Sequence, residues 1–379
     1  MRQGFRPFFL GAAAWAPLAL ALWLALLAGA LSLPLAFDAL AWYQYEMLFG
    51  YAGGVVAGFL LTAVTNWTGQ PPVCGPPLFG LVLLWAAARV MNLVGAAIGP
   101  WFAVTADIGF WAVLAGLILR EIVTGRNWRN LPVAALVTCL GVGCALSQAG
   151  TAGSGMAELG RRLGFGVVFV LMGLIGGRVV PSFTRNWLTQ PGAESLPVPM
   201  GWLDHAAMAL LAVAILSWIL APTIGLTGCL LLAAGIGLLV RLARWCGAAT
   251  LAEPLVLILH LGYGWLSTGL ALLDLSILWP DVVGRVAAMH ALTAGAVGTM
   301  SLAIMTRATL GHSGRTLAVD AATVWIYVLI QTGALLRVMS PVLPLDYSLV
   351  LAMAALLWGG AFVLFALHYG PMLATAGPG

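Results

Sequence analysis

Long apolar runs, each sufficient to cross the hydrocarbon core of a bilayer, fill almost the whole sequence. A membrane-spanning helix needs about 20 mainly apolar residues. Pro/Gly pairs such as Gln70-Pro71-Pro72, Gly99-Pro100 and Ser340-Pro341 separate the runs. The sequence predicts twelve spans, at residues 8–31, 39–64, 77–98, 101–120, 131–149, 160–180, 203–221, 223–243, 253–278, 285–308, 317–339 and 346–370.

The composition excludes a water-soluble fold. Hydrophobic residues make up 62% of the 379 residues, charged residues only 7%, and the mean hydropathy is +1.04. Because a chain this apolar cannot present a solvated surface, the sequence predicts an all-α polytopic bundle in a lipid bilayer, with residues 1–379 forming one integral membrane domain. No solvated basic patch marks the chain as a nucleic-acid partner.

The distribution of the arginines predicts the orientation of the chain in the membrane. All 16 basic residues are Arg. Eleven of them fall at the N-terminus or in the regions that follow even-numbered spans, four fall on the opposite side, and Arg89 lies within the third span. Positive residues are enriched on the cytoplasmic side of a membrane protein. We therefore expect both termini to be cytoplasmic.

Three helix ends share a Thr-containing pattern, centred on Thr65, Thr184 and Thr306 at the ends of spans 2, 6 and 10. Each of the two spacings corresponds to four helices. The pattern is compatible with three copies of a four-helix unit around a pseudo-threefold axis. The alternative is chance, because short Thr-rich helix ends recur in apolar chains.

Two ionisable residues lie at a similar depth on the predicted outer side of the membrane. Glu46 is about two turns into span 2, and His290 is about one turn into span 10. An ionisable group at membrane depth costs a few kcal/mol, so each is a candidate for function. Imidazole is a favoured ligand of haem iron and copper, and a carboxylate can fix its tautomer or carry a proton. The alternative is a simple His–Glu hydrogen bond within the bundle.

His260 and His312 lie on the predicted inner side. His260 is surrounded by the apolar run 255–261, and a neutral histidine there needs a partner. His312 follows span 10 closely. Each is a candidate iron ligand. His205 and His368, near the inner ends of spans 7 and 12, fit an interfacial position better.

Three arginines near the inner helix ends are candidates for binding a cofactor: Arg178, Arg307 and Arg315. Arginine binds carboxylates bidentately, and haem carries two propionates. Ordinary placement of positive residues on the cytoplasmic side explains these positions equally well. The sequence contains no Cys-x-x-Cys-His attachment motif, so any haem is bound non-covalently.

Several motifs, in order from the N-terminus to about Arg337, resemble the NnrS family. They are Gly4-Phe5-Arg6-Pro7-Phe8-Phe9, Glu46-Met47-Leu48-Phe49-Gly50, Asn66-Trp67-Thr68-Gly69, Gly177-Arg178-Val179, His260-Leu261-Gly262-Tyr263, His290-Ala291-Leu292-Thr293-Ala294-Gly295, and Met305-Thr306-Arg307 with Gly311-His312-Ser313-Gly314-Arg315.

The resemblance implies a haem- and copper-containing protein of the bacterial inner membrane, with twelve helices, associated with denitrification and with resistance to nitric oxide. His260, His290 and His312 persist in the chain and are the candidate ligands of haem b. The chain departs from the family pattern where Tyr43 and Tyr45 stand in place of two histidines. Tyr43 and Tyr45 are candidate metal ligands there, since a phenolate can bind ferric haem, but they are poor ligands for copper(I), which argues against copper at this position. The topology also resembles that of the haem–copper oxidases, by analogy alone.

Two functions are compatible with the sequence. The first is a haem protein that binds nitric oxide and either reduces or buffers it, with Glu46 either hydrogen-bonded to a metal ligand or carrying protons. As an enzyme it would be an oxidoreductase with an external electron donor, because the sequence has no flavin or nicotinamide motif. The second is a permease or metal-handling protein without redox chemistry, in which the same His and Arg residues line a solute path.

Overall fold

The computed structural model describes residues 3–150, 155–189 and 196–375, and all regular structure in these ranges is helical. Twelve helices in the described ranges are long and apolar enough to cross a membrane, which confirms the predicted number. Spans 2 and 10 are each composed of a short α-helix, a π-helical segment and a longer α-helix without interruption. The protein is therefore an all-α, multi-pass membrane protein.

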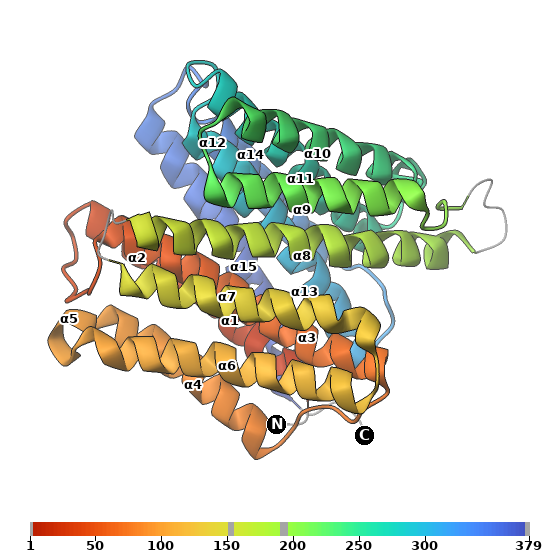
Figure 1. Cartoon of the computed structure of the whole chain (residues 1–379), viewed down its shortest axis with the longest axis horizontal. Coiled ribbons are helices and arrows are strands. Elements are labelled where there is room, and N and C mark those ends of the chain that lie inside the picture. Colours follow the sequence, from red (N-terminus) through yellow and green to blue (C-terminus); the bar gives the residue numbers. More distant parts are fainter. Residues whose placement is uncertain (1–2, 151–154, 190–195, 376–379) are drawn as a thin grey trace. The chain divides into compact units, whose positions relative to one another are not determined.

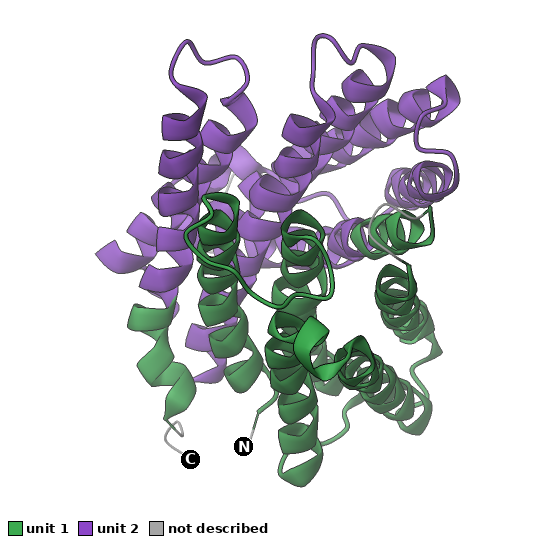
Figure 2. Cartoon of the chain, turned by 90° about the vertical axis from the view of Figure 1, so that its left-hand side faces the viewer, with its two compact units in different colours: residues 1–167, 366–379 green, residues 168–365 purple. Residues whose placement is uncertain are grey.

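The chain divides into two compact units, which are coloured separately in Figure 2. Unit 1 comprises residues 1–167 and 366–379, and unit 2 comprises residues 168–365. The helices α8 and α15 contribute to both units.

Unit 1 is built from the first helices of the chain (Figure 1). Within it, α4 packs against α6, α6 against α7, and α1 against α3. The elements are α1 (Phe5–Leu27), α2 (Ala39–Tyr45), η1 (Glu46–Ala52), α3 (Gly53–Thr68), α4 (Pro76–Leu93), α5 (Gly95–Ile98), α6 (Pro100–Thr124), η2 (Trp128–Asn130), α7 (Leu131–Ala149) and the start of α8 (Gly155–Leu188).

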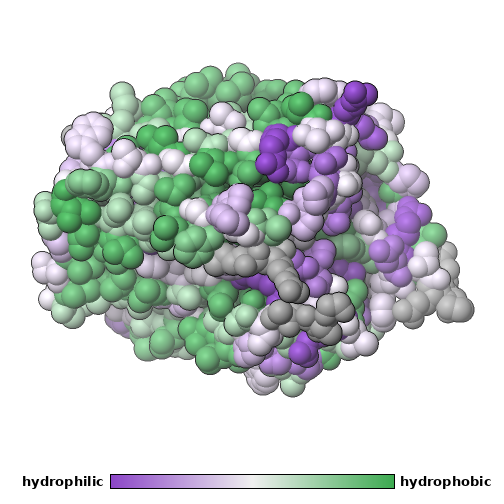
Figure 3. All heavy atoms as spheres, turned by 90° about the horizontal axis from the view of Figure 1, so that it is seen from below, coloured by the Kyte–Doolittle hydropathy of each residue, from purple (hydrophilic) through white to green (hydrophobic). Residues whose placement is uncertain are grey.

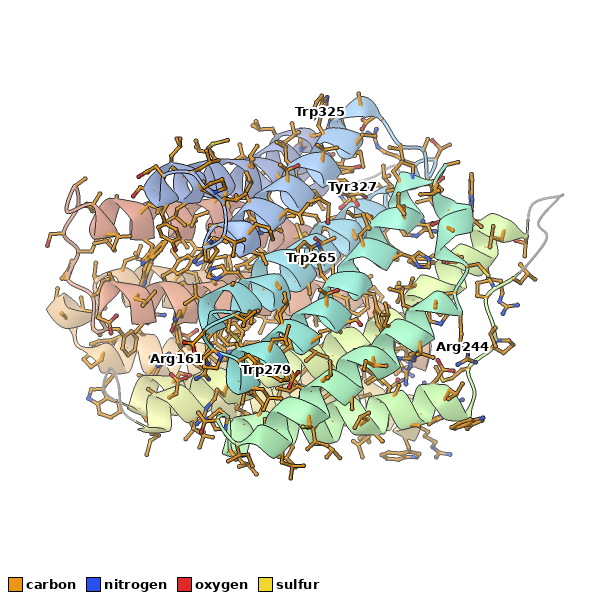
Figure 4. All side chains as sticks on the ribbon, turned by 90° about the horizontal axis from the view of Figure 1, so that it is seen from above. Arg161, Arg244, Trp265, Trp279, Trp325 and Tyr327 are labelled. Carbon is orange, nitrogen blue, oxygen red and sulfur yellow. The ribbon has the colours of Figure 1, made fainter. Side chains whose placement is uncertain are left out.

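Unit 2 is organised around α11, which packs against α10, α12, η4 and α13. Figure 4 shows Trp265 on α11 and Tyr327 on α14. The elements are α9 (Trp202–Leu220), α10 (Gly225–Ala243), η3 (Gly247–Thr250), α11 (Pro254–Leu278), α12 (Arg285–His290), η4 (Ala291–Val297), α13 (Gly298–His312), α14 (Ala321–Met339) and α15 (Tyr347–Ala374).

Large apolar side chains remain exposed along the spans. On α15, for example, Leu356 and Leu367 are 75% and 71% exposed. Apolar residues also cover much of the surface seen in Figure 3. A water-soluble protein cannot tolerate this much exposed apolar surface, whereas a helix facing lipid requires it. The exposed side chains therefore imply a lipid bilayer as the surroundings of the spans.

The predicted end of span 6 at residue 180 is wrong. The helix continues through Pro181 and ends at Leu188. A proline removes one helical hydrogen bond, which normally ends a helix in water. In a membrane bundle a proline can stay inside the helix when neighbouring groups compensate. This extension keeps Thr184 in the helix, where its hydroxyl donates to the Val180 carbonyl at 2.8 Å.

Candidate functional site

A cluster of charged side chains is buried within the spans of unit 1. Arg89 on α4 lies between two carboxylates, Glu46 on η1 and Asp107 on α6. Its Nη1 donates to Glu46 Oε2 at 2.6 Å, and its Nη2 donates to Asp107 Oδ1. The three residues are only 2%, 0% and 1% exposed. Since isolated charges at membrane depth are costly, the cluster can persist only because its members are paired.

The two carboxylates are bound very differently. Besides Arg89, Asp107 accepts hydrogen bonds from Asn92 at 3.0 Å, Gln148 at 2.9 Å and the Tyr45 hydroxyl at 2.7 Å. Glu46 accepts from Arg89 and, at 2.8 Å, from the Trp15 indole, both at Oε2. Its second oxygen, Oε1, is buried and has no hydrogen-bond partner.

The π-helical segment η1 makes room for this cluster. A Cβ added to Gly50 would lie 2.6 Å from Glu46 Oε2 and 2.7 Å from Arg89 Nη1, so a larger residue would push apart the paired side chains. The Gly50 carbonyl accepts the Trp85 indole N–H at 3.0 Å. Because π-helical segments shift the side chains that follow them, they often occur at functional sites.

The two tyrosines predicted as metal-site residues lie in different surroundings. The Tyr45 hydroxyl contacts Asp107, Gln148 and the Cys144 thiol, whose sulfur is 3.0 Å away. Tyr43 stacks on Trp23 with ring centroids 4.5 Å apart. Tyr45 therefore lies with Glu46 in one buried polar network.

His260 on α11 contributes a second polar site, in unit 2. Its Nε2 lies 2.9 Å from the Thr184 hydroxyl on α8. In the arrangement in which that hydroxyl donates its single hydrogen to the Val180 carbonyl, Nε2 carries the imidazole hydrogen and donates it to Thr184. The lone pair is then on Nδ1, which is buried without a hydrogen-bond partner.

Gly247 of η3 lies directly against this unpartnered nitrogen. A Cβ added to Gly247 would be 2.8 Å from His260 Nδ1. A buried lone pair beside a residue without a side chain is a place where a metal or a hydrogen-bond donor could bind, although that would require the Gly247 backbone to shift.

The other two candidate histidines lie on span 10. His290 is the last residue of α12, and its Nδ1 donates to the Val286 carbonyl at 2.7 Å. This contact leaves the lone pair on Nε2, as in many metal-binding histidines. His312 is the last residue of α13 and is exposed. Glu46 belongs to unit 1 and His290 to unit 2.

The three arginines predicted to bind a cofactor all belong to unit 2. Arg307 is half-buried and lies over the Phe183 ring, with its guanidinium carbon 3.8 Å from the ring centroid. Arg178 on α8 and Arg315 after α13 are exposed. The stacking on Phe183 fixes the position of the Arg307 guanidinium. Its N–H groups point outward in the plane of the guanidinium and can donate hydrogen bonds to a carboxylate.

A further buried ion pair in unit 2 was not predicted. Arg241 on α10 donates to Asp204 Oδ1 at 2.8 Å, and to the Gly173 carbonyl and the Tyr263 hydroxyl at 3.0 Å each. Asp204 also accepts from Arg244, which is labelled in Figure 4, at 3.1 Å. By its position in the sequence, Arg241 is one of the eleven arginines on the predicted cytoplasmic side.

The pairing of Arg89 with Asp107 was also missed, although a signal was present in the sequence. Opposite charges occur in two consecutive spans joined by a short loop, which places both charges inside one helical hairpin. A cation and an acid in such a hairpin are expected to pair.

The histidines suit haem better than a bare metal ion. A haem iron needs one axial imidazole, because the porphyrin supplies its other ligands. Copper or zinc bound by protein alone needs three or four ligands. Within the described ranges, no three His, Cys, Asp or Glu side chains converge on one point. His290 satisfies the first requirement with its lone pair on Nε2, and His260 would satisfy it after a shift of the Gly247 backbone.

The fold and these sites together define a class, namely multi-pass membrane proteins with polar clusters buried inside their spans. The model of the NnrS protein family matches residues 1–376. The chain therefore belongs to the NnrS family, which confirms the resemblance found in the sequence. None of the curated proteins compared with the chain matches it.

Proposed function

We propose that the chain binds haem b non-covalently in the membrane and binds nitric oxide at the haem iron, for its reduction or its buffering. The observation that carries this proposal is the buried, unpartnered Nδ1 of His260 beside Gly247. Membership of the NnrS family supports it. The lipid bilayer would be that of the bacterial inner membrane.

The residues of the chain would have three roles in this function. His260, His290 and His312 are the candidate axial ligands, and the hydrogen bond from His290 to Val286 would hold the imidazole in the tautomer that a ligand needs. Arg178, Arg307 and Arg315 are the candidate partners of the propionates. A bound haem would supply an iron atom with an open position for nitric oxide.

Glu46 is the candidate acid–base residue, while Tyr43 and Tyr45 stand where the resemblance places histidines. In the network around Arg89, the Tyr45 hydroxyl donates to Asp107, so it is held as a neutral phenol. A neutral phenol is a poor metal ligand, and we therefore propose no copper at this position. Electrons for reduction would come from an external donor.

The test is an absorption spectrum of the protein purified in detergent, oxidised and dithionite-reduced, before and after anaerobic addition of nitric oxide. We expect a Soret band and reduced α/β bands that shift with nitric oxide. Replacement of the axial ligand among His260→Ala, His290→Ala and His312→Ala should abolish or shift these bands. His205→Ala is the matched control, since His205 is an exposed histidine bound to its own helix.

A spectrum without a Soret band after expression with sufficient haem would refute the haem proposal. That result would favour the second candidate function, a permease without redox chemistry. The observation that favours this second function is the set of charged groups buried inside the spans, which line solute paths in transporters.

A further inference from the structure

The buried cluster of unit 1 has an unbalanced charge. Arg89 is the one cation that contacts Glu46 or Asp107 among the described residues, so two ionised carboxylates would leave a net charge of −1. An uncompensated charge within a membrane span costs several kcal/mol. The arrangement is therefore favourable only if one of the two acids is neutral.

The hydrogen bonds indicate which acid is neutral. Asp107 accepts from four side chains, from Arg89, Asn92, Gln148 and Tyr45, and so has the surroundings of a carboxylate anion. Glu46 receives both of its donors at Oε2, while Oε1 has none. A bare anionic oxygen in this position would be far more costly than a neutral hydroxyl.

We propose that Glu46 is a reversible proton-binding site, neutral when loaded, and that Asp107 is the fixed counter-ion of Arg89. Arg89 from α4 contacts Glu46 directly, and α1 contributes the neutral Trp15. The other titratable groups of the cluster are linked to Glu46 through Arg89, namely Asp107 from α6, Tyr45 from α2 and Cys144 from α7. Release of the proton leaves Arg89 between two anions.

Such a site has a direct use in the proposed function. Reduction of nitric oxide to nitrous oxide consumes protons, and an acid inside the membrane can supply one. This use rests on the proposed function, but the proton site itself does not, because unit 1 contains the whole cluster and none of the candidate haem ligands His260, His290 and His312.

The experiment is infrared spectroscopy of the carbonyl band of a protonated carboxyl group. Asp274 on α11 is a second fully buried acid, and neither of its oxygens has a hydrogen-bond partner. The reference protein is therefore Asp274→Asn, which removes that second band. Glu46→Gln is added to the reference, and Glu158→Gln is added separately as the matched control, because Glu158 is exposed and paired with Arg161.

At neutral pH we expect the reference protein to show the band, with a downshift in D₂O that demonstrates exchange of the proton. Adding Glu46→Gln should abolish the band with little change in the thermal midpoint, because glutamine mimics the neutral acid. Adding Glu158→Gln should leave the band intact. Adding Asp107→Asn should lower the thermal midpoint more than Glu46→Gln does, because it removes the counter-ion.

Three results would overturn the assignment: no band in the reference protein, a band that survives Glu46→Gln, or a larger loss of stability for Glu46→Gln than for Asp107→Asn. If the combined variants do not fold, titration of the reference protein still decides. The band must disappear at high pH and return on acidification. A missing Soret band together with an intact carboxyl band would refute only the proposed function, and the reverse pattern only this inference.

Discussion

Removal of Asp204 should be among the most destabilising single changes in unit 2. Asp204 Oδ1 accepts from Arg241, and Oδ2 accepts from Arg244 and, at 2.9 Å, from the Gly201 backbone N–H at the start of α9. Asp204 and Arg241 are both buried. Replacement by alanine leaves a buried guanidinium whose remaining acceptors, the Gly173 carbonyl and the Tyr263 hydroxyl, are neutral.

The magnitude follows from three contributions to the free energy of unfolding. Breaking a buried ion pair on one side costs about 3–5 kcal/mol. Loss of the capping contact to Gly201 adds about 1 kcal/mol. The Arg244 contact adds little, because this side chain is partly exposed and can turn to water. We expect Asp204→Ala to cost about 4–6 kcal/mol, and Asp204→Asn about half of that, since the amide oxygen still accepts.

Reversible unfolding by SDS in mixed micelles, followed by tryptophan fluorescence, would measure these differences. Glu158→Ala is the control, since it breaks the exposed pair with Arg161 and should cost at most about 1 kcal/mol. Adding Arg241→Met to Asp204→Ala should recover part of the loss, because the remaining partner, Arg244, is partly exposed and no unpaired ion stays buried. The reasoning is refuted if Asp204→Ala lies within about 1 kcal/mol of the control, or if the second change deepens the loss.

Three further predictions follow from single positions in unit 2. Asp274→Asn should lower the free energy of unfolding by less than about 1 kcal/mol in the same assay, because the replaced carboxyl makes no hydrogen bond; a loss of several kcal/mol would show an ionised, bound Asp274. Gly247→Ala should reduce the haem content of the purified protein, measured by absorbance, because its Cβ would press on His260. The control Gly264→Ala should leave the haem content unchanged, because its Cβ would meet only Leu242, at 3.7 Å. Equal losses of haem in the two variants would contradict a role of His260. Gly333→Ala should lower the free energy of unfolding by about 1–3 kcal/mol, because its Cβ would lie 2.6 Å from the Trp358 backbone nitrogen. Gly360→Ala, with open space around the added Cβ, should leave that free energy unchanged or raise it. Equal stabilities of the two variants would refute this explanation.

The number and positions of the spans could be predicted from the sequence because hydrophobicity alone sets them. A run of about 20 apolar residues has one stable state in a bilayer, whatever its neighbours are. The starts predicted at residues 39 and 285 agree with the observed starts at Ala39 and Arg285. The end of span 6 was missed because a proline is a reliable stop signal only where water can bind the freed backbone groups.

The polar clusters were harder to predict, because they depend on which helix faces which. Glu46 was selected as an intramembrane acid, but its contacts come from Trp15 and Arg89, far away in the sequence. Apolar periodicity does not orient a helix that is hydrophobic on all sides. The partners therefore became visible only with the packed structure.

The π-helical segments are a further feature that periodicity could not reveal. Glu46 begins η1, and His290 directly precedes η4. In each segment a carbonyl accepts an indole N–H, Gly50 from Trp85 at 3.0 Å and Ala294 from Trp358 at 3.1 Å.

Four residues after each of these carbonyls, a glycine makes room for the indole. A Cβ on Gly54 would lie 3.3 Å from Trp85 Nε1, and a Cβ on Gly298 would lie 2.8 Å from Trp358 Nε1. Spans 2 and 10 therefore contain the same arrangement of a carbonyl, an indole and a glycine. When the two sequences are aligned on this arrangement, Glu46 falls at the position of His290. The Thr-based alignment of the sequence pairs Thr65 with Thr306 and misses this register by three residues, because it rests on helix ends. The shared arrangement indicates more strongly than the Thr pattern that spans 2 and 10 are equivalent. It also places one ionisable residue at the same position in each span.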